Sequence, residues 1–318
     1  MTSSRTPLPA TLLAFTAIYV IWGTTFLCIT LTLRTMPAFL SGAVRFLIAG
    51  GLMYAWLRSR EPRPFAGLHA GGTALCGVLL TGIGNGFVIW SQLALPSGIA
   101  ALFVGALPVS ILLLDWMFFS RRTPRPLAVL GVALGLAGVT VLSLNTRAIA
   151  HNARPIYVIA ALTAELAWAL GTLLQPRYVG AARVRNFTCL QMLVGAGFQL
   201  LMSLVDREWI GFAPSRVSLQ SLLALAYLIL FGSIIAFSCY SYLVAHVAAQ
   251  KISTYALVNP VIALALGAAV LGERVTPAAI VATLLVLAGV ALVLLQREPV
   301  RDLRALRPGL AAVERAEP

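Results

Sequence analysis

The sequence predicts an all-α membrane protein with ten transmembrane helices, arranged as two inverted five-helix repeats. Three observations support this prediction. Hydrophobic residues make up 60% of the 318 residues, charged residues make up 10%, and the mean hydropathy is +0.92. Soluble domains carry about 25% charged residues. The apolar residues fall into ten stretches, and the second five stretches repeat features of the first five.

Each apolar stretch is close to the roughly 20 residues that a helix needs to cross the hydrocarbon core. The connectors between the stretches are short and hold most of the charged residues. The expected spans are 11–33, 37–57, 70–94, 98–119, 126–144, 156–176, 187–205, 218–245, 251–271 and 277–296.

The internal repeat is clearest between the third and eighth spans. Residues 79–93 (LLTGIGNGFVIWSQL) align with residues 229–243 (ILFGSIIAFSCYSYL), so that Gly82 meets Gly232 and Phe87 meets Phe237. A unit of five spans ends on the opposite side of the membrane from its start, so its copy inserts upside down. Inverted repeats of this kind are typical of alternating-access transporters.

The repeat divides the chain into five expected parts. They are an N-terminal cytoplasmic tail (1–10), a first repeat (11–145), an outer linker (146–155), a second repeat (156–296) and a C-terminal cytoplasmic tail (297–318).

The basic residues indicate how the chain is oriented. With both termini in the cytoplasm, sixteen of the 23 Lys and Arg residues lie in inner segments, six lie in outer segments, and Arg45 lies within a span. This asymmetry follows the positive-inside rule. The net charge of +13 therefore reflects topology and attraction to anionic inner-leaflet lipid rather than nucleic-acid binding.

The motifs of membrane-embedded enzymes and of ATP-driven pumps are absent. The sequence has no HExxH, no GxGD pair, no GxSG and no Walker motif. No Cys or His group has metal-ligand spacing. We therefore expect neither enzymatic activity nor a cofactor or bound metal.

Two ionisable residues lie within spans, where a charge costs roughly 3 kcal/mol. Glu165 is the acidic residue at mid-depth in the sixth span; it is expected to bind a cationic group, to carry a proton, or to pair structurally with Arg45 or a hydroxyl. Arg45 in the second span is expected to snorkel outward, to pair across the bundle, or to hold a substrate carboxylate.

Several aromatic and amide residues lie deeper than the interfacial belt where membrane aromatics are usually found. Trp22 and Trp168 occupy corresponding places in the two repeats, and Trp90 corresponds to Tyr240. Either an aromatic-lined cavity or ordinary helix packing would explain them. Further polar candidates at depth are Asn85, Tyr255 and Asn259.

Proline and small residues predict where helices bend and pack. Pro108 and Pro260 lie inside the fourth and ninth spans at corresponding positions, and each removes a backbone hydrogen bond, so both are candidate hinges. Gly131, Gly135 and Gly138 form a small-residue stripe, which predicts close helix packing and is compatible with a dimer face.

The order of several segments resembles the EamA family of the drug/metabolite transporter superfamily, including its YedA- and YddG-type inner-membrane exporters. The segments are IWGTTF (21–26), VRFLIAGG (44–51), LPSGIAAL (95–102) and LGERVTP (271–277). The resemblance implies export of amino acids or related metabolites through a central cavity lined by the first, third, fourth, sixth, eighth and ninth helices. Mapped onto this chain, those helices contribute Trp22, Asn85, Trp90, Glu165, Trp168, Tyr240, Tyr255 and Asn259.

The expected function is a secondary transporter of the bacterial inner membrane that exports a small metabolite by alternating access. The expected partners are this small-molecule substrate and membrane lipid, with the chain as a monomer or homodimer. A multidrug or hydrophobic-cation exporter is the main alternative, because Glu165 beside Trp168 resembles a cation site. A lipid scramblase or passive channel is a further alternative.

Overall fold

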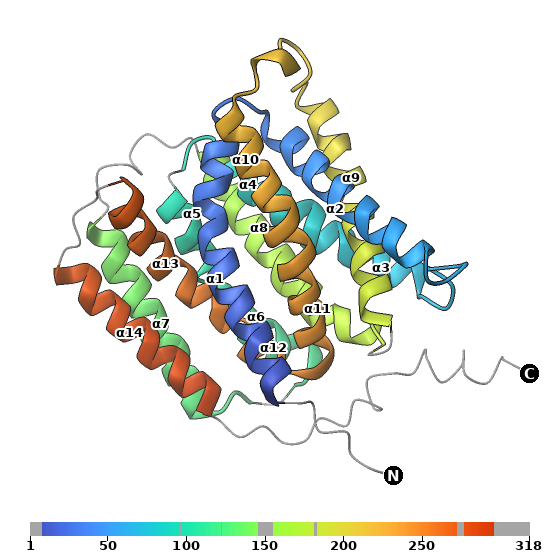
Figure 1. Cartoon of the computed structure of the whole chain (residues 1–318). Coiled ribbons are helices and arrows are strands. Elements are labelled where there is room, and N and C mark those ends of the chain that lie inside the picture. Colours follow the sequence, from blue (N-terminus) through green and yellow to red (C-terminus); the bar gives the residue numbers. More distant parts are fainter. Residues whose placement is uncertain are drawn as a thin grey trace, which may run out of the picture.

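The computed structural model describes residues 8–95, 97–121, 123–145, 155–180, 183–271 and 277–295, and within these ranges its secondary structure is entirely helical (Figure 1). The helices are α1 (Leu8–Leu33), α2 (Ala38–Arg58), α3 (Ala70–Cys76), the π-helix η1 (Gly77–Asn85), α4 (Gly86–Ser91), α5 (Ser97–Val104), α6 (Leu107–Leu114), the π-helix η2 (Asp115–Phe119), α7 (Pro126–Asn145), α8 (Pro155–Leu174), the 3-10 helix η4 (Gln175–Arg177), α9 (Val184–Val205), the 3-10 helix η6 (Pro214–Arg216), α10 (Leu219–Tyr227), the π-helix η7 (Leu228–Ile235), α11 (Ala236–His246), α12 (Ala249–Ile252), α13 (Thr254–Leu271) and α14 (Pro277–Leu295).

Six helical stretches are long and apolar enough to cross a membrane. They are Pro9–Leu33, Ala38–Arg58, Ala70–Ser91, Pro155–Arg177, Val184–Val205 and Leu219–His246. Shorter apolar helices cover Leu107–Phe119, Pro126–Gly138 and Ile280–Val293. These lengths and compositions support a multi-pass helical membrane protein, and the count of ten spans stays a prediction.

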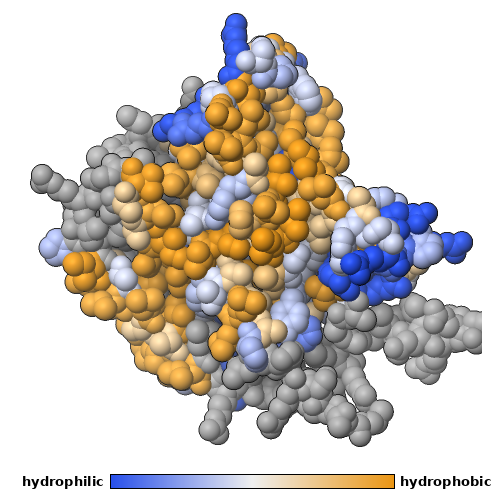
Figure 2. Space-filling model, in the orientation of Figure 1, coloured by the Kyte–Doolittle hydropathy of each residue, from blue (hydrophilic) through white to orange (hydrophobic). Residues whose placement is uncertain are grey.

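The outer surface of the bundle is apolar. Figure 2 shows a face dominated by hydrophobic residues, with hydrophilic residues gathered mainly toward its top and right-hand edges. Large apolar side chains on several helices point outward, among them Leu13, Leu47, Leu201 and Leu223. Such a surface is stable against lipid tails and unfavourable in water.

The corresponding helices α2 and α9 of the two halves run in opposite directions. At one end of the bundle the ring of Trp90 stacks on Phe39 at 6.0 Å and lies 4.7 Å from the ring of Tyr157. The indole N–H of Trp90 also donates to Asp206 (3.1 Å). Thus α2 and α8 begin at this end of the bundle, whereas α4 and α9 end there. Accordingly α2 runs away from this end and its counterpart α9 runs toward it.

The small-residue stripe on α7 packs within the chain, against α14, which lies beside it in Figure 1. A Cβ atom added at Gly131 would lie 2.7 Å from the carbonyl oxygen of Gly289, and one at Gly138 would lie 2.7 Å from that of Ala282. The two contacts pair early residues of one helix with late residues of the other. These glycines are therefore used in an intramolecular contact and are not free to form a dimer face.

The space around each glycine predicts opposite effects for two Gly→Ala substitutions, one inside this contact and one outside it. At Gly289 the new Cβ would lie 2.4 Å from the carbonyl oxygen of Gly131, so we expect Gly289→Ala to cost about 1–3 kcal/mol of unfolding free energy. At Gly51 on α2 nothing lies within 4 Å, so Gly51→Ala should be neutral or stabilise the helix by about 0.5–1 kcal/mol. Denaturant unfolding in detergent measures both; equal stability of the two variants would contradict the packing.

Buried polar groups hold η1 against α9. The hydroxyl of Thr81 donates to the carbonyl oxygens of Gly77 (2.7 Å) and Gln191 (2.9 Å), and the amide of Gln199 donates to the carbonyl oxygen of Thr81 (2.6 Å). Backbone groups at membrane depth need such partners, because no water is available to satisfy them. These bonds hold the π-helical turn of the first half against α9 of the second half.

The two candidate hinge prolines lie in different settings. The fourth expected span breaks at residues 105–106, between α5 and α6, and Pro108 lies in the first turn of α6. A proline there costs little, since that N–H has no partner inside the helix. Pro260, in contrast, lies inside α13. The two prolines therefore differ in setting, with a helix break beside Pro108 and an internal proline at Pro260, and their role as hinges stays a prediction.

Candidate functional site

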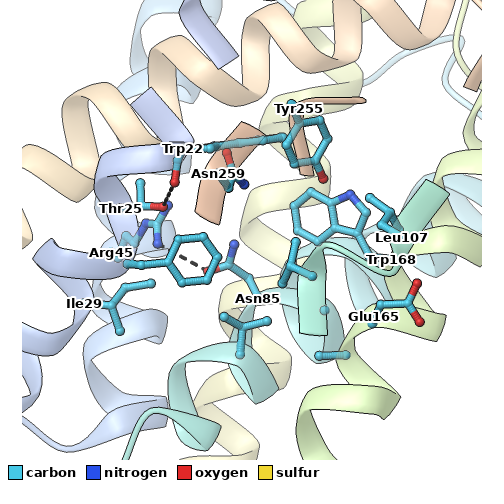
Figure 3. Close-up of a pocket in the computed structure, with 15 residues that line it drawn as sticks. Trp22, Thr25, Ile29, Arg45, Asn85, Leu107, Glu165, Trp168, Tyr255 and Asn259 are labelled. Carbon is cyan, nitrogen blue, oxygen red and sulfur yellow. Dashed lines mark hydrogen bonds between the residues drawn. The ribbon is translucent and has the colours of Figure 1, made fainter. Parts of the chain in front are cut away.

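A cavity lies at the centre of the bundle, between helices of both halves (Figure 3). It contains about 570 Å³ of empty space, part of which opens toward solvent. Its lining comes from α1, α2, η1, α4, α5, α6, α8 and α13. The residues are Trp22, Thr25, Phe26, Ile29, Arg45, Gly84, Asn85, Val88, Val104, Leu107, Ala164, Glu165, Trp168, Tyr255 and Asn259.

Aromatic rings form one wall of the cavity. The ring of Trp22 lies 5.4 Å from that of Trp168 and 4.7 Å from that of Tyr255, both in edge-to-face arrangements that favour ring contacts. The indole N–H of Trp22 donates to the carbonyl oxygen of Gly232 in η7 (3.2 Å). The wall therefore joins α1 of the first half to three elements of the second half: α8, α13 and η7.

Glu165 reaches the cavity from α8. It lies one turn before Trp168, so both side chains share the inward face of this helix, whereas Leu162 and Leu166 on the other face are exposed. The Glu165 side chain, which has the side chain of Ser110 as a polar neighbour, is 4% exposed. Its Oε1 atom has no hydrogen-bond partner among the described residues. A buried carboxylate oxygen needs a donor, which a bound solute or water would supply.

Tyr255 and Asn259 lie one turn apart on α13 and both line the cavity. Asn259 is 1% exposed, and its Oδ1 atom is a second acceptor without a partner in the part of the chain that the structure describes. Asn85, the last residue of η1, presents its side chain to the same space. The cavity is therefore apolar over most of its wall, with a few polar groups at defined places, as is usual for ligand sites.

Arg45 contributes a buried positive charge. Its guanidinium donates from Nε to the hydroxyl of Ser233 (2.8 Å) and from Nη1 to Oδ1 of Asn85 (3.3 Å). No ion pair joins Arg45 to a carboxylate of the described residues, Glu165 included. The structural Arg45–Glu165 pair considered from the sequence is therefore absent, and Figure 3 shows the two residues at opposite ends of the cavity.

The structure brings together six of the eight sequence-predicted site residues. They are Trp22, Asn85, Glu165, Trp168, Tyr255 and Asn259. Tyr240 lies one layer behind them: it is fully buried, its ring is 5.2 Å from that of Trp22, and its hydroxyl bonds to that of Thr172 (2.5 Å). Trp90 lies at the end of the bundle against Asp206 and does not line the cavity.

From the sequence, Arg45 is a candidate to hold a substrate carboxylate but is not among the eight residues predicted to line the cavity, whereas the eighth helix is predicted to line it. Instead, that helix supplies Ser233 and Tyr240 from behind, and the second helix supplies Arg45. One signal was available. Arg45 lies in mid-span without an acidic residue nearby in its own helix, which indicates an unmatched charge at depth.

A helical bundle with an apolar exterior and a partly polar cavity between two related halves is the architecture of a membrane transporter. The chain belongs to the EamA-like transporter family, whose family model matches it twice, over residues 9–144 and 155–295.

Individual relatives agree with this family. The inner membrane transporter YedA of Escherichia coli (strain K12) is 34% identical over 266 residues, which cover 83% of each chain. A probable amino-acid metabolite efflux pump of Salmonella typhimurium (strain LT2) is 26% identical, covering 86% of this chain and 90% of its own. A solved crystal structure of a protein that is 25% identical covers 90% of this chain and 96% of its own, with a TM-score of 0.71.

Proposed function

We propose that this protein exports amino acids or related small metabolites across the bacterial inner membrane by alternating access. In this proposal ten transmembrane helices form two inverted five-helix repeats, and the central cavity binds the solute. The observation that carries the proposal is that cavity, because it is built from both halves and contains charges of both signs. The names of the relatives add support, including a probable terminal-alkyne amino-acid exporter of Streptantibioticus cattleyicolor that is 27% identical over 221 residues.

A hydrophobic-cation exporter is the second candidate, and one feature of the site favours it. Glu165 and the ring of Trp168 line one end of the cavity, an arrangement that suits a desolvated cation. Arg45 in the same cavity argues against it, because a solute with only positive charge would be attracted by Glu165 and repelled by Arg45. An amino acid carries a carboxylate for Arg45 as well.

Transport into inside-out vesicles tests the proposal. We expect saturable uptake of at least one amino acid, and faster uptake when the vesicles are preloaded with the same unlabelled amino acid. A carrier shows such counterflow, whereas a channel or scramblase shows a leak that does not saturate. Uptake of quaternary amines without uptake of any amino acid would favour the cation exporter instead.

We also propose that both termini are cytoplasmic, because of the excess of basic residues in the inner segments. In a cysteine-free background, a cysteine at position 150 should react with a membrane-impermeant maleimide in intact cells. Reaction only after membrane disruption would reverse the orientation.

Pro260 is proposed as a hinge in α13. Pro260→Ala should restore a backbone hydrogen bond and straighten the helix, so we expect transport to slow several-fold while thermal stability is kept. Pro108→Ala is the matched control, since Pro108 lies at a helix start where the ring is compatible with the backbone. Initial rates of counterflow measure both. Equal rates for Pro260→Ala and the wild type would remove the hinge.

A further inference from the structure

Arg45 is a buried cation whose partners in the described structure are all neutral. It is 2% exposed, and its guanidinium contacts the hydroxyl of Ser233, the amide oxygen of Asn85 and the face of Phe46, whose ring centre lies 4.7 Å from the guanidinium carbon. A guanidinium has five N–H donors, and these two hydrogen bonds use two of them. A buried charge without a counter-ion is costly, so its retention in a cavity wall indicates an anionic partner that arrives from outside the protein.

The surroundings hold the guanidinium at a defined place. Asn85 is the last residue of the π-helix η1, and Ser233 belongs to the π-helix η7, so Arg45 is anchored to corresponding segments of both halves. Gly232 makes room for it, because a Cβ atom there would lie 3.0 Å from Nη2. Such π-helical turns are frequent at functional sites. The anchoring orients the group in advance, which lowers the cost of binding.

The rest of the cavity indicates how a solute bound to Arg45 would lie. Figure 3 draws Asn85 and Asn259 between Arg45 and the ring wall, with Glu165 at the far end beside Trp168. The amide oxygens of Asn85 and Asn259 can each accept from an ammonium group, and that of Asn259 has no partner among the residues described. Ile29 and Leu107 add apolar wall for a side chain.

We propose that Arg45 is the carboxylate-binding residue of this cavity. The α-carboxylate of an amino acid binds the guanidinium through the N–H groups that Ser233 and Asn85 leave available. The α-ammonium binds the amide oxygens of Asn85 and Asn259, and the side chain extends toward the rings and Glu165. This assignment rests on the proposed export of amino acids and makes a free carboxylate a requirement for binding.

Binding measurements on the full-length purified protein test this assignment. Thermal shifts are first measured with the twenty protein amino acids. The amino acid with the largest shift is then compared by calorimetry with its methyl ester, which keeps the ammonium and lacks the negative charge, and with its N-acetyl derivative, which lacks the ammonium. We expect the wild type to bind the amino acid about 10- to 100-fold more tightly than the ester, as befits charge-assisted hydrogen bonds.

In Arg45→Gln this preference should vanish, because affinity for the amino acid falls to that for the ester. Arg45→Lys keeps the charge without the planar pair of donors and should keep part of the preference. Arg183→Gln is the control, since Arg183 forms an exposed ion pair with Glu61 (3.3 Å) away from the cavity. If Arg45→Gln does not fold, the affinities of the wild type and of Arg45→Lys for the amino acid and for its ester still test the role of Arg45.

The outcomes separate the two proposals. Equal wild-type affinity for the amino acid and its ester overturns the role of Arg45 and leaves amino-acid export standing. The absence of a shift with all twenty amino acids, together with counterflow of a quaternary amine, overturns the proposed function itself.

Discussion

Glu165→Gln is expected to reduce amino-acid transport about 10-fold or more while leaving the protein folded. The glutamine keeps the size and hydrogen-bonding capacity of the side chain, but it removes the negative charge that would hold a cationic side chain of the solute or a proton at the far end of the cavity. Hydrogen bonds to charged groups contribute about 1.5–3 kcal/mol, and each 1.4 kcal/mol changes a binding constant tenfold. Initial uptake into inside-out vesicles and thermal unfolding measure the two effects.

Glu61→Gln provides the matched control. Glu61 pairs with Arg183 at the bundle end, and about a third of its side chain is exposed, so this pair should contribute about 0–1 kcal/mol and nothing to transport. Wild-type transport together with wild-type stability in Glu165→Gln would mean that the carboxylate is idle. Lost stability with normal transport would make it a structural partner of Ser110.

Much of the fold could be predicted from hydropathy, because burial in lipid imposes one simple requirement on each helix. The expected spans coincide with helical stretches to within a few residues; for example, the range expected at 126–144 is α7 (Pro126–Asn145). Interruptions could not be predicted. The π-helical turns of η1 and η7 receive hydrogen bonds from other helices, from Gln199 to the Thr81 carbonyl and from Trp22 to the Gly232 carbonyl, which sequence spacing does not place.

The repeat was a good guide to the middle of the spans and a poor one near their ends. Trp22 and Trp168 lie near the middle of their helices, so inversion keeps both at the same depth and their rings meet. Trp90 lies in the last turn of α4, and inversion sends its counterpart Tyr240 toward the opposite end of the bundle. Correspondence in sequence therefore places two residues in one cavity only when both lie at mid-span.

Charges show a different limit. Insertion cost marks Arg45 and Glu165 as exceptional, but it does not say whether they pair with each other. That depends on which faces of α2 and α8 meet the cavity and on where Ser233 reaches Arg45 from the other half. Only the three-dimensional structure shows that Arg45 and Glu165 do not pair and instead lie at separate ends of one cavity.

Trp22→Ala is expected to cost about 3–5 kcal/mol of unfolding free energy, the range for removing a large aromatic side chain from a core. Trp22 is 5% exposed and contacts the rings of Trp168, Tyr255, Tyr240 and Phe237, all of which belong to the second half. Its loss would therefore loosen the contact between the halves as well as open the cavity wall. Denaturant unfolding in detergent measures the cost.

The variant Trp22→Phe distinguishes the contribution of Trp22 to packing from its contribution to the shape of the cavity. The phenyl ring keeps most of the ring contacts and loses the hydrogen bond to the Gly232 carbonyl, so we expect a cost of about 1 kcal/mol. Trp56→Ala is the control, because Trp56 is 40% exposed at the end of α2 and its loss should cost less than about 1 kcal/mol. A Trp22→Ala variant as stable as Trp56→Ala would show that the ring wall does not hold the halves together. If Trp22→Phe is stable but its KM for the transported amino acid rises, the indole also shapes the binding site, and the aromatic wall serves both the fold and the solute.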